Sequence, residues 1–230
     1  MSNQLVKSIL FISVLTILLL PKCEAGYLEG APCSTQNTAF LEATGLWRLP
    51  PVAVQCVDIS GMGNRTRLPF TPEITNATTL YADHMNLVLF PKFATFRLPN
   101  LEMIDLSGNK IRKLSSKSLR FTRKIETLLL ADNNVYIPKR RPLLVSSSLT
   151  TLSLSNNQIR RLTNYTFSKL PKLRVLYLDR NLLKHLRPDV IKPLTNLKYL
   201  HVGNNRLTEL PSKSSLPDSL KIFITKGNPV

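Results

Sequence analysis

One pattern of aliphatic residues and asparagine recurs five times between residues 101 and 207, at a constant interval of 24 residues. Each copy has aliphatic residues at its first, fourth, sixth and eleventh positions and asparagine at its ninth. The copies open at Leu101, Ile125, Leu149, Leu173 and Leu197, and their asparagines are Asn109, Asn133, Asn157, Asn181 and Asn205. No single unit of this size can bury its apolar side alone, so the copies are expected to stack and fold together.

The positions within a copy indicate a strand followed by a turn. The fourth and sixth positions are alternate residues, which is typical of a short strand with one buried face. The asparagine then turns the chain. Because its side chain has two amide donors and a carbonyl acceptor, a buried asparagine can satisfy backbone groups of its own copy and of neighbouring copies. Stacked copies should therefore share a parallel sheet, a continuous core and a ladder of asparagines.

This pattern, LxxLxLxxNxL, resembles the leucine-rich repeat in its 24-residue extracellular type. The resemblance implies an α/β solenoid, a leucine-rich repeat horseshoe with a parallel β-sheet on the concave face and irregular or 3₁₀ segments on the convex face. It also implies a small, secreted, invertebrate-like protein. Weaker copies begin at Ala77 and Leu220. We expect an array over residues 77–230, with copies starting near 77, 101, 125, 149, 173, 197 and 220.

Residues 1–25 have the features of a secretory signal peptide. Lys7 precedes an apolar run from Ile9 to Leu20, and a small-residue site ends at Ala25. The alternative is a membrane span, but about a dozen apolar residues fall short of the roughly 20 that a spanning helix needs. We expect cleavage after Ala25, no membrane span in the mature chain, and a secreted, extracellular product.

Cys33 and Cys56 are the two cysteines that remain after the signal peptide. They can pair in the oxidising exterior, and a metal site is disfavoured because no histidine or further cysteine accompanies them. We predict that this disulfide staples an N-terminal capping region, residues 26–76. A strand-like run within it, Val52–Ile59, is expected to pair with the first repeat.

Three triplets match the N-glycosylation signal, at Asn64, Asn76 and Asn164. In a secreted chain each could carry a glycan. Asn164 lies in the variable part of its copy, where a glycan would point to solvent. Asn76 lies just before the strand of the first copy, at its edge.

The chain is strongly basic, with a formal net charge of +17 at pH 7, and little of this charge belongs to the signal peptide. Acidic partners are therefore expected. A secreted protein meets acidic protein surfaces and sulfated glycans first, so we expect no nucleic-acid partner.

Basic residues recur at the twelfth and thirteenth positions of the copies. Equal positions stack along a solenoid at roughly 4.8 Å, so these residues would form a stripe along one edge. This basic stripe consists of Arg112, Lys113, Arg160, Arg161, Lys184 and His185. It suits a linear acidic glycan, and the alternative is a solvated face that keeps the protein soluble.

The inner face of the sheet is predicted to bind a protein ligand. Its variable positions point away from the core, and no structural need explains aromatic residues there. Tyrosine and arginine are favoured at interfaces and gather in the C-terminal half. The predicted site consists of Arg174, Tyr177, Asp179, Arg180, Lys198, Tyr199 and His201. The alternative is a hydrated surface that has no ligand.

The sequence contains no catalytic, metal or cofactor motif. His84, His185 and His201 lie in different copies, and no nucleophile motif or glycine-rich phosphate loop occurs. Asp179 and His201 fall in neighbouring copies, but without a nucleophile they suit an interface pair better than catalysis. We therefore expect a non-enzymatic protein without cofactors.

The strand predicted at residues 221–225 would lie at the edge of the sheet. An uncovered edge invites pairing with another chain, so a dimer is one alternative. The other is that Lys221 and Lys226 keep the edge solvated.

Two functions follow from these features. The first is a secreted binding protein that recognises an extracellular protein ligand or receptor through the concave face. The resemblance connects such proteins with developmental signalling and innate recognition. The alternative is an extracellular matrix protein that binds sulfated glycans through the basic stripe.

Overall fold

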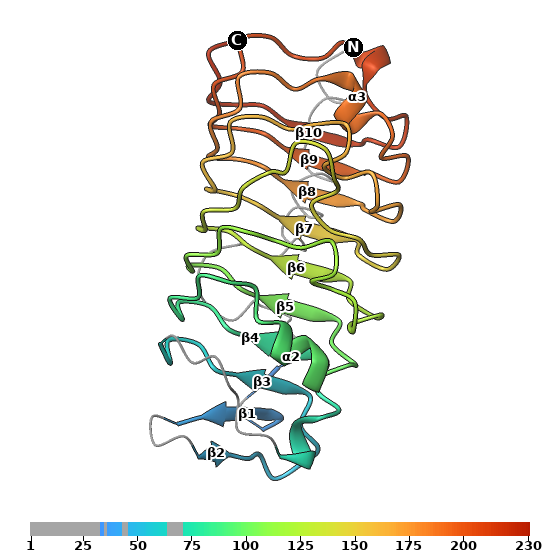
Figure 1. The fold of residues 1–230 in the computed structure, drawn as a ribbon. Helices are drawn as coiled ribbons and strands as arrows, with labels where there is room; N and C mark the ends of the chain where they lie inside the picture. The colour runs from blue at the N-terminus through green and yellow to red at the C-terminus, as the bar shows by residue number, and fades with distance from the viewer. Residues whose placement is uncertain (1–32, 35, 43–45, 64–70) are drawn as a thin grey trace, which may run out of the picture. The chain divides into compact units, whose positions relative to one another are not determined.

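The computed structural model describes residues 33–34, 36–42, 46–63 and 71–230, so the predicted signal peptide and Asn64 lie outside the described residues. Within the described part, ten strands form one sheet in the order β10-β9-β8-β7-β6-β5-β4-β3-β1-β2 (Figure 1). The strands are β1 (Thr38–Leu41), β2 (Trp47–Arg48), β3 (Cys56–Asp58), β4 (Thr79–Tyr81), β5 (Met103–Asp105), β6 (Thr127–Leu129), β7 (Thr151–Ser153), β8 (Val175–Tyr177), β9 (Tyr199–His201) and β10 (Ile222–Ile224).

Strands β3 to β10 pair in parallel with their fourth-position residues side by side. Leu128 of β6, for example, pairs with Ile104 of β5 and Leu152 of β7. All three are fully buried, and a slip of one residue would turn each of them to the other face. The predicted α/β solenoid with a parallel sheet is confirmed.

The sheet continues on the N-terminal side of the copy at residue 77. Strand β3 lies inside the run Val52–Ile59 and pairs in parallel with β4, as that run predicts. Strand β1 pairs in parallel with β3 and antiparallel with β2. Val54, Val57 and Ile59 are buried with the spacing of the first, fourth and sixth positions, so this segment is one further coil.

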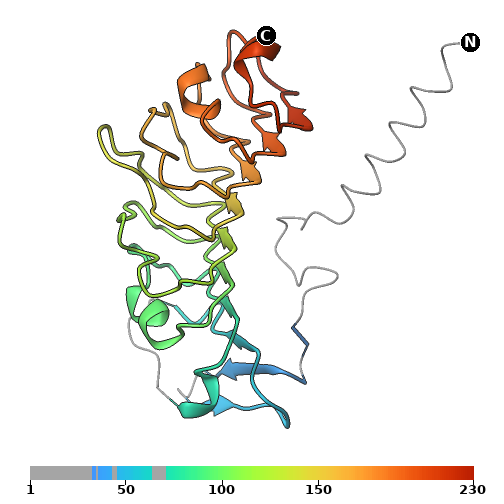
Figure 2. The same cartoon turned by 90° about the vertical axis from the view of Figure 1, so that its right-hand side faces the viewer.

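The core lies between the sheet and the outer segments. Aliphatic residues at the first, fourth, sixth and eleventh positions of the five regular copies are all 3% exposed or less. Figure 2 shows the strands along the concave side and the helices α2 (Lys92–Arg97) and α3 (Pro188–Ile191) on the convex side. Two 3₁₀ turns complete the outer segments, η1 (Pro72–Ile74) and η2 (Lys213–Ser215). No helix in the described part of the chain is long and apolar enough to cross a membrane.

The ninth-position asparagines form the predicted ladder. The Nδ2 of Asn133 donates to the carbonyl oxygen of Leu106 in the preceding copy at 2.9 Å. Its Oδ1 accepts from the backbone N–H of Ile111, also in the preceding copy, at 2.9 Å. The same pair of contacts recurs at Asn109, Asn157, Asn181, Asn205 and Asn228. Each asparagine therefore joins two coils, which is why the copies fold together.

The eighth position has a left-handed backbone in every copy, which the sequence analysis missed. Values of φ run from +50° to +84° along this column. The column consists of His84, Gly108, Asp132, Asn156, Arg180, Asn204 and Gly227. Glycine, asparagine and aspartate adopt this conformation readily, whereas a residue with a long side chain does so at a cost. Arg180 is therefore the exceptional member of the column.

The predicted disulfide between Cys33 and Cys56 is confirmed, with a Cα–Cα distance of 5.8 Å. Cys56 lies on β3, between Thr38 of β1 and Thr79 of β4. The bond therefore holds Cys33 against the strand that connects β1 to the repeat strands.

Candidate protein-binding face

Strands β8 and β9 bring three rings together on the concave face. Tyr177 ends β8, and Tyr199 and His201 begin and end β9. The ring centroids of Tyr177 and Tyr199 are 5.2 Å apart, and that of His201 is 6.4 Å from Tyr177 and 6.5 Å from Tyr199. These separations suit favourable aromatic contacts. None of the three residues belongs to the continuous core, so the rings form a cluster of their own.

The two tyrosines are buried and are not exposed side chains that stand apart. Tyr177 is 9% exposed and Tyr199 8%, because the rings cover one another. The accessible part of the predicted site is cationic, since Arg174, Arg180 and Lys198 are exposed. Arg174 and Lys198 lie side by side just before the two strands, with the Lys198 N–H donating to the Arg174 carbonyl at 2.8 Å.

Asp179 follows β8 and fixes the orientation of His201. Its Oδ1 lies 3.0 Å from His201 Nδ1 and accepts a hydrogen bond from Ser155 Oγ at 2.6 Å. Burial raises the pKa of the Asp179 carboxyl, but the hydrogen bonds from His201 and Ser155 and the charge of His201 together outweigh it. The net result is a lowered pKa for Asp179.

The pairing of Asp179 with His201 could be predicted from the sequence, but the contact of Ser155 with Asp179 was not predicted. The signal was present, because Ser155 and Asp179 both occupy the seventh position of consecutive copies. In this trio the carboxylate receives both contacts, and the histidine does not bridge the serine and the aspartate. A serine is activated by a histidine base that accepts its proton, so this arrangement orients side chains and does not create a nucleophile.

The second position carries a column of charges that changes sign along the array. Successive members are joined by backbone hydrogen bonds of 2.7 to 2.9 Å. The column consists of Glu102, Glu126, Thr150, Arg174, Lys198 and Lys221. Two exposed acids therefore stand on one side of Thr150 and three exposed bases on the other.

All six residues of the basic stripe are exposed. The stripe is interrupted between Lys113 and Arg160, where the copy at 125 has Tyr136 and Ile137. Lys139 partly fills this interruption, because it lines one pocket of about 410 Å³ together with Arg160 and Arg161. At the other end, His185 Nδ1 faces Glu209 Oε1 at 3.5 Å.

The remaining candidate residues are dispersed. Asn76 and Asn164 are exposed. His84 contacts the neighbouring Asp83, with His84 Nδ1 2.8 Å from Asp83 Oδ2, and shares no contact with the other two histidines among the described residues. In that same part of the chain, no group of three or more histidine, cysteine, aspartate and glutamate side chains is placed to hold a metal ion.

Two family models match the sequence, and both are described as leucine rich repeat. The first matches residues 75–135 and 147–207, which together are more than half of the chain. The second matches residues 196–221. No curated protein matches the sequence.

Solved structures with the same fold include Toll, an internalin and TLR13. Toll, in the Toll–Spatzle complex of Drosophila, is 22% identical with a TM-score of 0.60, covering 76% of this chain and 24% of that one. Internalin C2 of Listeria monocytogenes is 28% identical with a TM-score of 0.52, covering 68% of this chain and 64% of that one. TLR13, in complex with ssRNA13, is 19% identical with a TM-score of 0.59, covering 78% of this chain and 26% of that one. The chain thus spans less than two thirds of each of these structures.

Proposed function

Because the chain belongs to the leucine-rich repeat family, whose domains are typically interaction scaffolds and not enzymes, we propose that it is a secreted, non-enzymatic binding protein. Its ligand is a protein or cell-surface partner that binds the concave face. Arg174, Tyr177, Asp179, Arg180, Lys198, Tyr199 and His201 form the centre of the binding site.

The ring cluster is the observation that carries this proposal. Binding energy at protein interfaces concentrates in packed aromatic and arginine residues that exclude water. Tyr177, Tyr199 and His201 supply a packed, preorganised centre, since their mutual contacts fix the rings before a ligand arrives. Exposed Arg180 and Lys198 supply charges that a partner can contact at the rim.

The change in the sign of charge along the second-position column indicates which charges a fitting partner would carry. An acidic segment would meet Arg174, Lys198 and Lys221, and a basic segment would meet Glu102 and Glu126. Glu126 and Lys198 are three strands apart, or about 14 Å at the usual strand spacing. A folded protein can present both signs at that separation, whereas a uniformly anionic polymer such as RNA would be repelled at the acidic end.

An extracellular location agrees with the disulfide, because such bonds persist in oxidising compartments. The Toll–Spatzle complex is described as a molecular hub in Drosophila development and innate immunity. The similarity to Toll supports developmental signalling or innate recognition as the role of this chain. If the protein is secreted through a glycosylating pathway, enzymatic deglycosylation should lower its mass. Asn76→Gln and Asn164→Gln should each remove part of that change.

A capture experiment tests the proposed function. Three forms of the mature protein are immobilised and exposed to extracellular fluid of its source. They are the wild type, a concave-face variant with Arg180→Glu and Lys198→Glu, and a stripe variant with Arg160→Glu and Lys184→Glu. The last variant is a matched control because it reverses the same number of exposed charges away from the concave face. A protein retained by the wild type and the control but lost by the concave-face variant supports the proposal, and equal retention by all three contradicts it.

The second candidate function is binding of a sulfated glycan along the basic stripe. The observation that favours it is the pocket in which Lys139 joins Arg160 and Arg161. Elution from heparin only at high salt, lost in the Arg160→Glu, Lys184→Glu variant and kept in the Arg180→Glu, Lys198→Glu variant, would support this function.

A further inference from the structure

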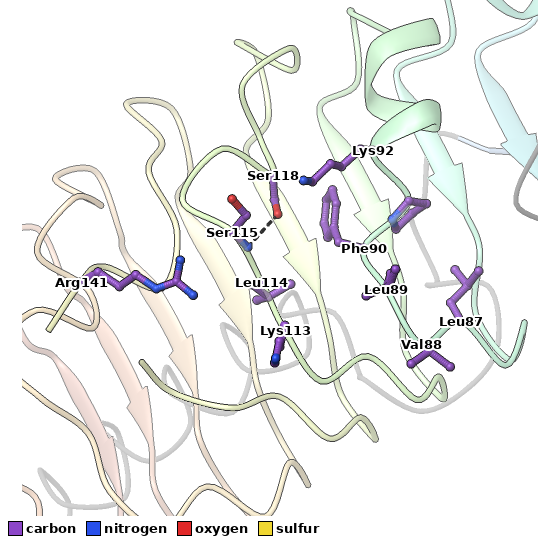
Figure 3. Close-up of a pocket in the computed structure, with 11 residues that line it drawn as sticks. Leu87, Val88, Leu89, Phe90, Lys92, Lys113, Leu114, Ser115, Ser118 and Arg141 are labelled. Atoms are coloured by element: carbon purple, nitrogen blue, oxygen red, sulfur yellow. Dashed lines mark hydrogen bonds between the residues drawn. The ribbon is translucent and has the colours of Figure 1, made fainter. Parts of the chain in front are cut away.

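A second pocket, of about 530 Å³, opens between the copies that start at 77 and 101 (Figure 3). Its base is formed by Leu87, Phe90 and Leu114, each 5% exposed or less. Its mouth is formed by Val88 and Leu89, which are 47% and 69% exposed. The volume falls in the usual range for small-ligand sites, and the apolar base continues into an apolar mouth that faces water.

Two adjoining segments line this pocket. The backbone of Leu89 bridges that of Lys113 in parallel, which places residues 87–92 beside residues 113–118. The following segment turns on itself, since the Ser115 N–H donates to Ser118 Oγ at 3.0 Å. These contacts fix the positions of the two segments that line the pocket.

Three cations stand around this apolar base. Lys92, Lys113 and Arg141 line the pocket and are exposed. In Figure 3 the Arg141 side chain extends from the neighbouring coil toward Leu114, and Lys92 lies next to Phe90 with its nitrogen end toward Ser118. None of the three takes part in an ion pair with a described acidic residue. Their charges are therefore available to a ligand.

We propose that this pocket binds a single-chain lipid with an acidic headgroup. The acyl chain would cover Phe90, Leu114 and the exposed Leu89, and the headgroup, a carboxylate or a phosphate monoester, would lie among the three cations. A sulfated glycan would satisfy the cations but leave the apolar base in contact with water. A neutral apolar compound would fill the base but leave the cations without a counter-charge.

This site is separate from the proposed protein-binding face. It uses residues of the copies at 77 and 101 together with Arg141, whereas the ring cluster belongs to the copies at 173 and 197. Lipid binding would therefore remain if the concave face had no ligand, and the two proposals can fail independently.

Calorimetric titration of the purified mature protein provides the test. The probes are palmitate, lysophosphatidate and lysophosphatidylcholine, each below its micelle concentration. We expect saturable binding of at least one of the two acidic lipids, and about tenfold weaker binding of the zwitterionic lipid because its net charge is zero. Comparison of palmitate with lysophosphatidate distinguishes a carboxylate from a phosphate ligand.

Exposed positions allow variants that leave the core unchanged. Lys113→Glu with Arg141→Glu, and separately Leu89→Glu, should weaken binding about tenfold or more, because each adds negative charge to the lining of the pocket. Lys184→Glu, an exposed stripe cation, and Leu210→Glu, an exposed leucine of the copy at 197, are the matched controls and should stay within about twofold.

The proposal would be overturned by the absence of binding to both acidic lipids, by equal affinity for the zwitterionic lipid, or by affinities that the pocket variants leave unchanged. Binding to anionic vesicles without binding to the dispersed lipids would also overturn it, since that result would indicate a membrane surface and not a pocket.

Discussion

Replacing Asn181 by alanine should destabilise the array more than any surface substitution of similar size. Asn181 is 3% exposed. Its Nδ2 donates to the carbonyls of Leu154 at 2.8 Å and Leu178 at 3.0 Å. Its Oδ1 accepts from the backbone N–H groups of Asn157 at 3.0 Å and Ile159 at 2.8 Å. The Nδ2 also donates to the Asp179 carbonyl at 3.1 Å, so one side chain serves five backbone groups in two coils.

The expected magnitude follows from the groups that alanine would leave without a partner. The Leu178 carbonyl keeps a second donor, Asn205 Nδ2 at 2.8 Å, and the Asp179 carbonyl keeps the Asn156 N–H at 3.0 Å. The N–H groups of Asn157 and Ile159 and the Leu154 carbonyl have no other hydrogen-bond partner among the described residues. At about 1 kcal/mol each, the low end for a buried unsatisfied group, the free energy of unfolding should fall by about 3 kcal/mol. For a chain of this size that lowers Tm by about 6 to 12 °C.

The assay is urea unfolding followed by circular dichroism, with Asn134→Ala as the control. Asn134 is exposed, and among the described residues its side chain hydrogen-bonds only to Gln158 Nε2, at 3.4 Å, so its loss should cost less than about 0.5 kcal/mol. Asn156 is unsuitable as a control because its φ of +50° itself disfavours alanine. Equal losses for Asn181→Ala and Asn134→Ala would refute the ladder as a source of stability.

Four further outcomes are expected. Arg180→Gly should raise the free energy of unfolding by about 1 kcal/mol, because glycine adopts the left-handed backbone without strain, while weakening ligand capture. Asp179 has a lowered pKa in the folded protein, so its ionised carboxylate stabilises the fold at pH values above its unfolded-state pKa of about 3.9, and this stabilisation is lost as the pH falls through its folded-state pKa. Asp179→Asn should therefore make Tm depend less on pH in that range. Burial raises the pKa of Asp105, so its ionisation costs stability as the pH rises, and Asp105→Asn should raise Tm at pH 7. Removing the Cys33–Cys56 disulfide by double serine substitution should cost about 3 kcal/mol in urea unfolding, since it closes a loop of moderate length.

Much of the fold could be predicted because burial repeats with the sequence. Each coil must present the same apolar positions to its neighbours, so the interval of 24 residues determined the strands, the register and the asparagine ladder. The coil of β3 was harder to place as a repeat. Its Val54, Val57 and Ile59 keep the spacing, but Met62 stands where the asparagine would be, and the strand pairs with β4 at an interval of 23.

The left-handed column could also have been found. Five of its seven members are glycine, asparagine or aspartate, the residues that favour this backbone, and they stand one residue before each ladder position. His84 and Arg180 concealed the pattern because a search for turn residues passes over them.

The surfaces were less predictable, because the side chains outside the core do not follow the repeat spacing. The register showed which residues share the concave face but not that Tyr177 and Tyr199 would cover each other. The lipid pocket depends on Arg141, which reaches it from the seventeenth position of a different copy. A contact of that kind depends on the path of an irregular outer segment, and the repeat pattern does not specify that path.

Arg180 belongs both to the repeated backbone turn and to the variable concave surface. The turn at the eighth position is imposed by the strand before it and the asparagine after it, so every residue there must adopt a positive φ. Asparagine or glycine would satisfy the turn at lower cost, as in the copies at 149, 197 and 220. An arginine is the more strained choice, and it stands immediately after Asp179, whose carboxylate contacts His201 of the ring cluster. Strain of this kind persists where a function uses the side chain. The concave face at β8 is therefore the place where a gain in stability and a loss of binding should coincide.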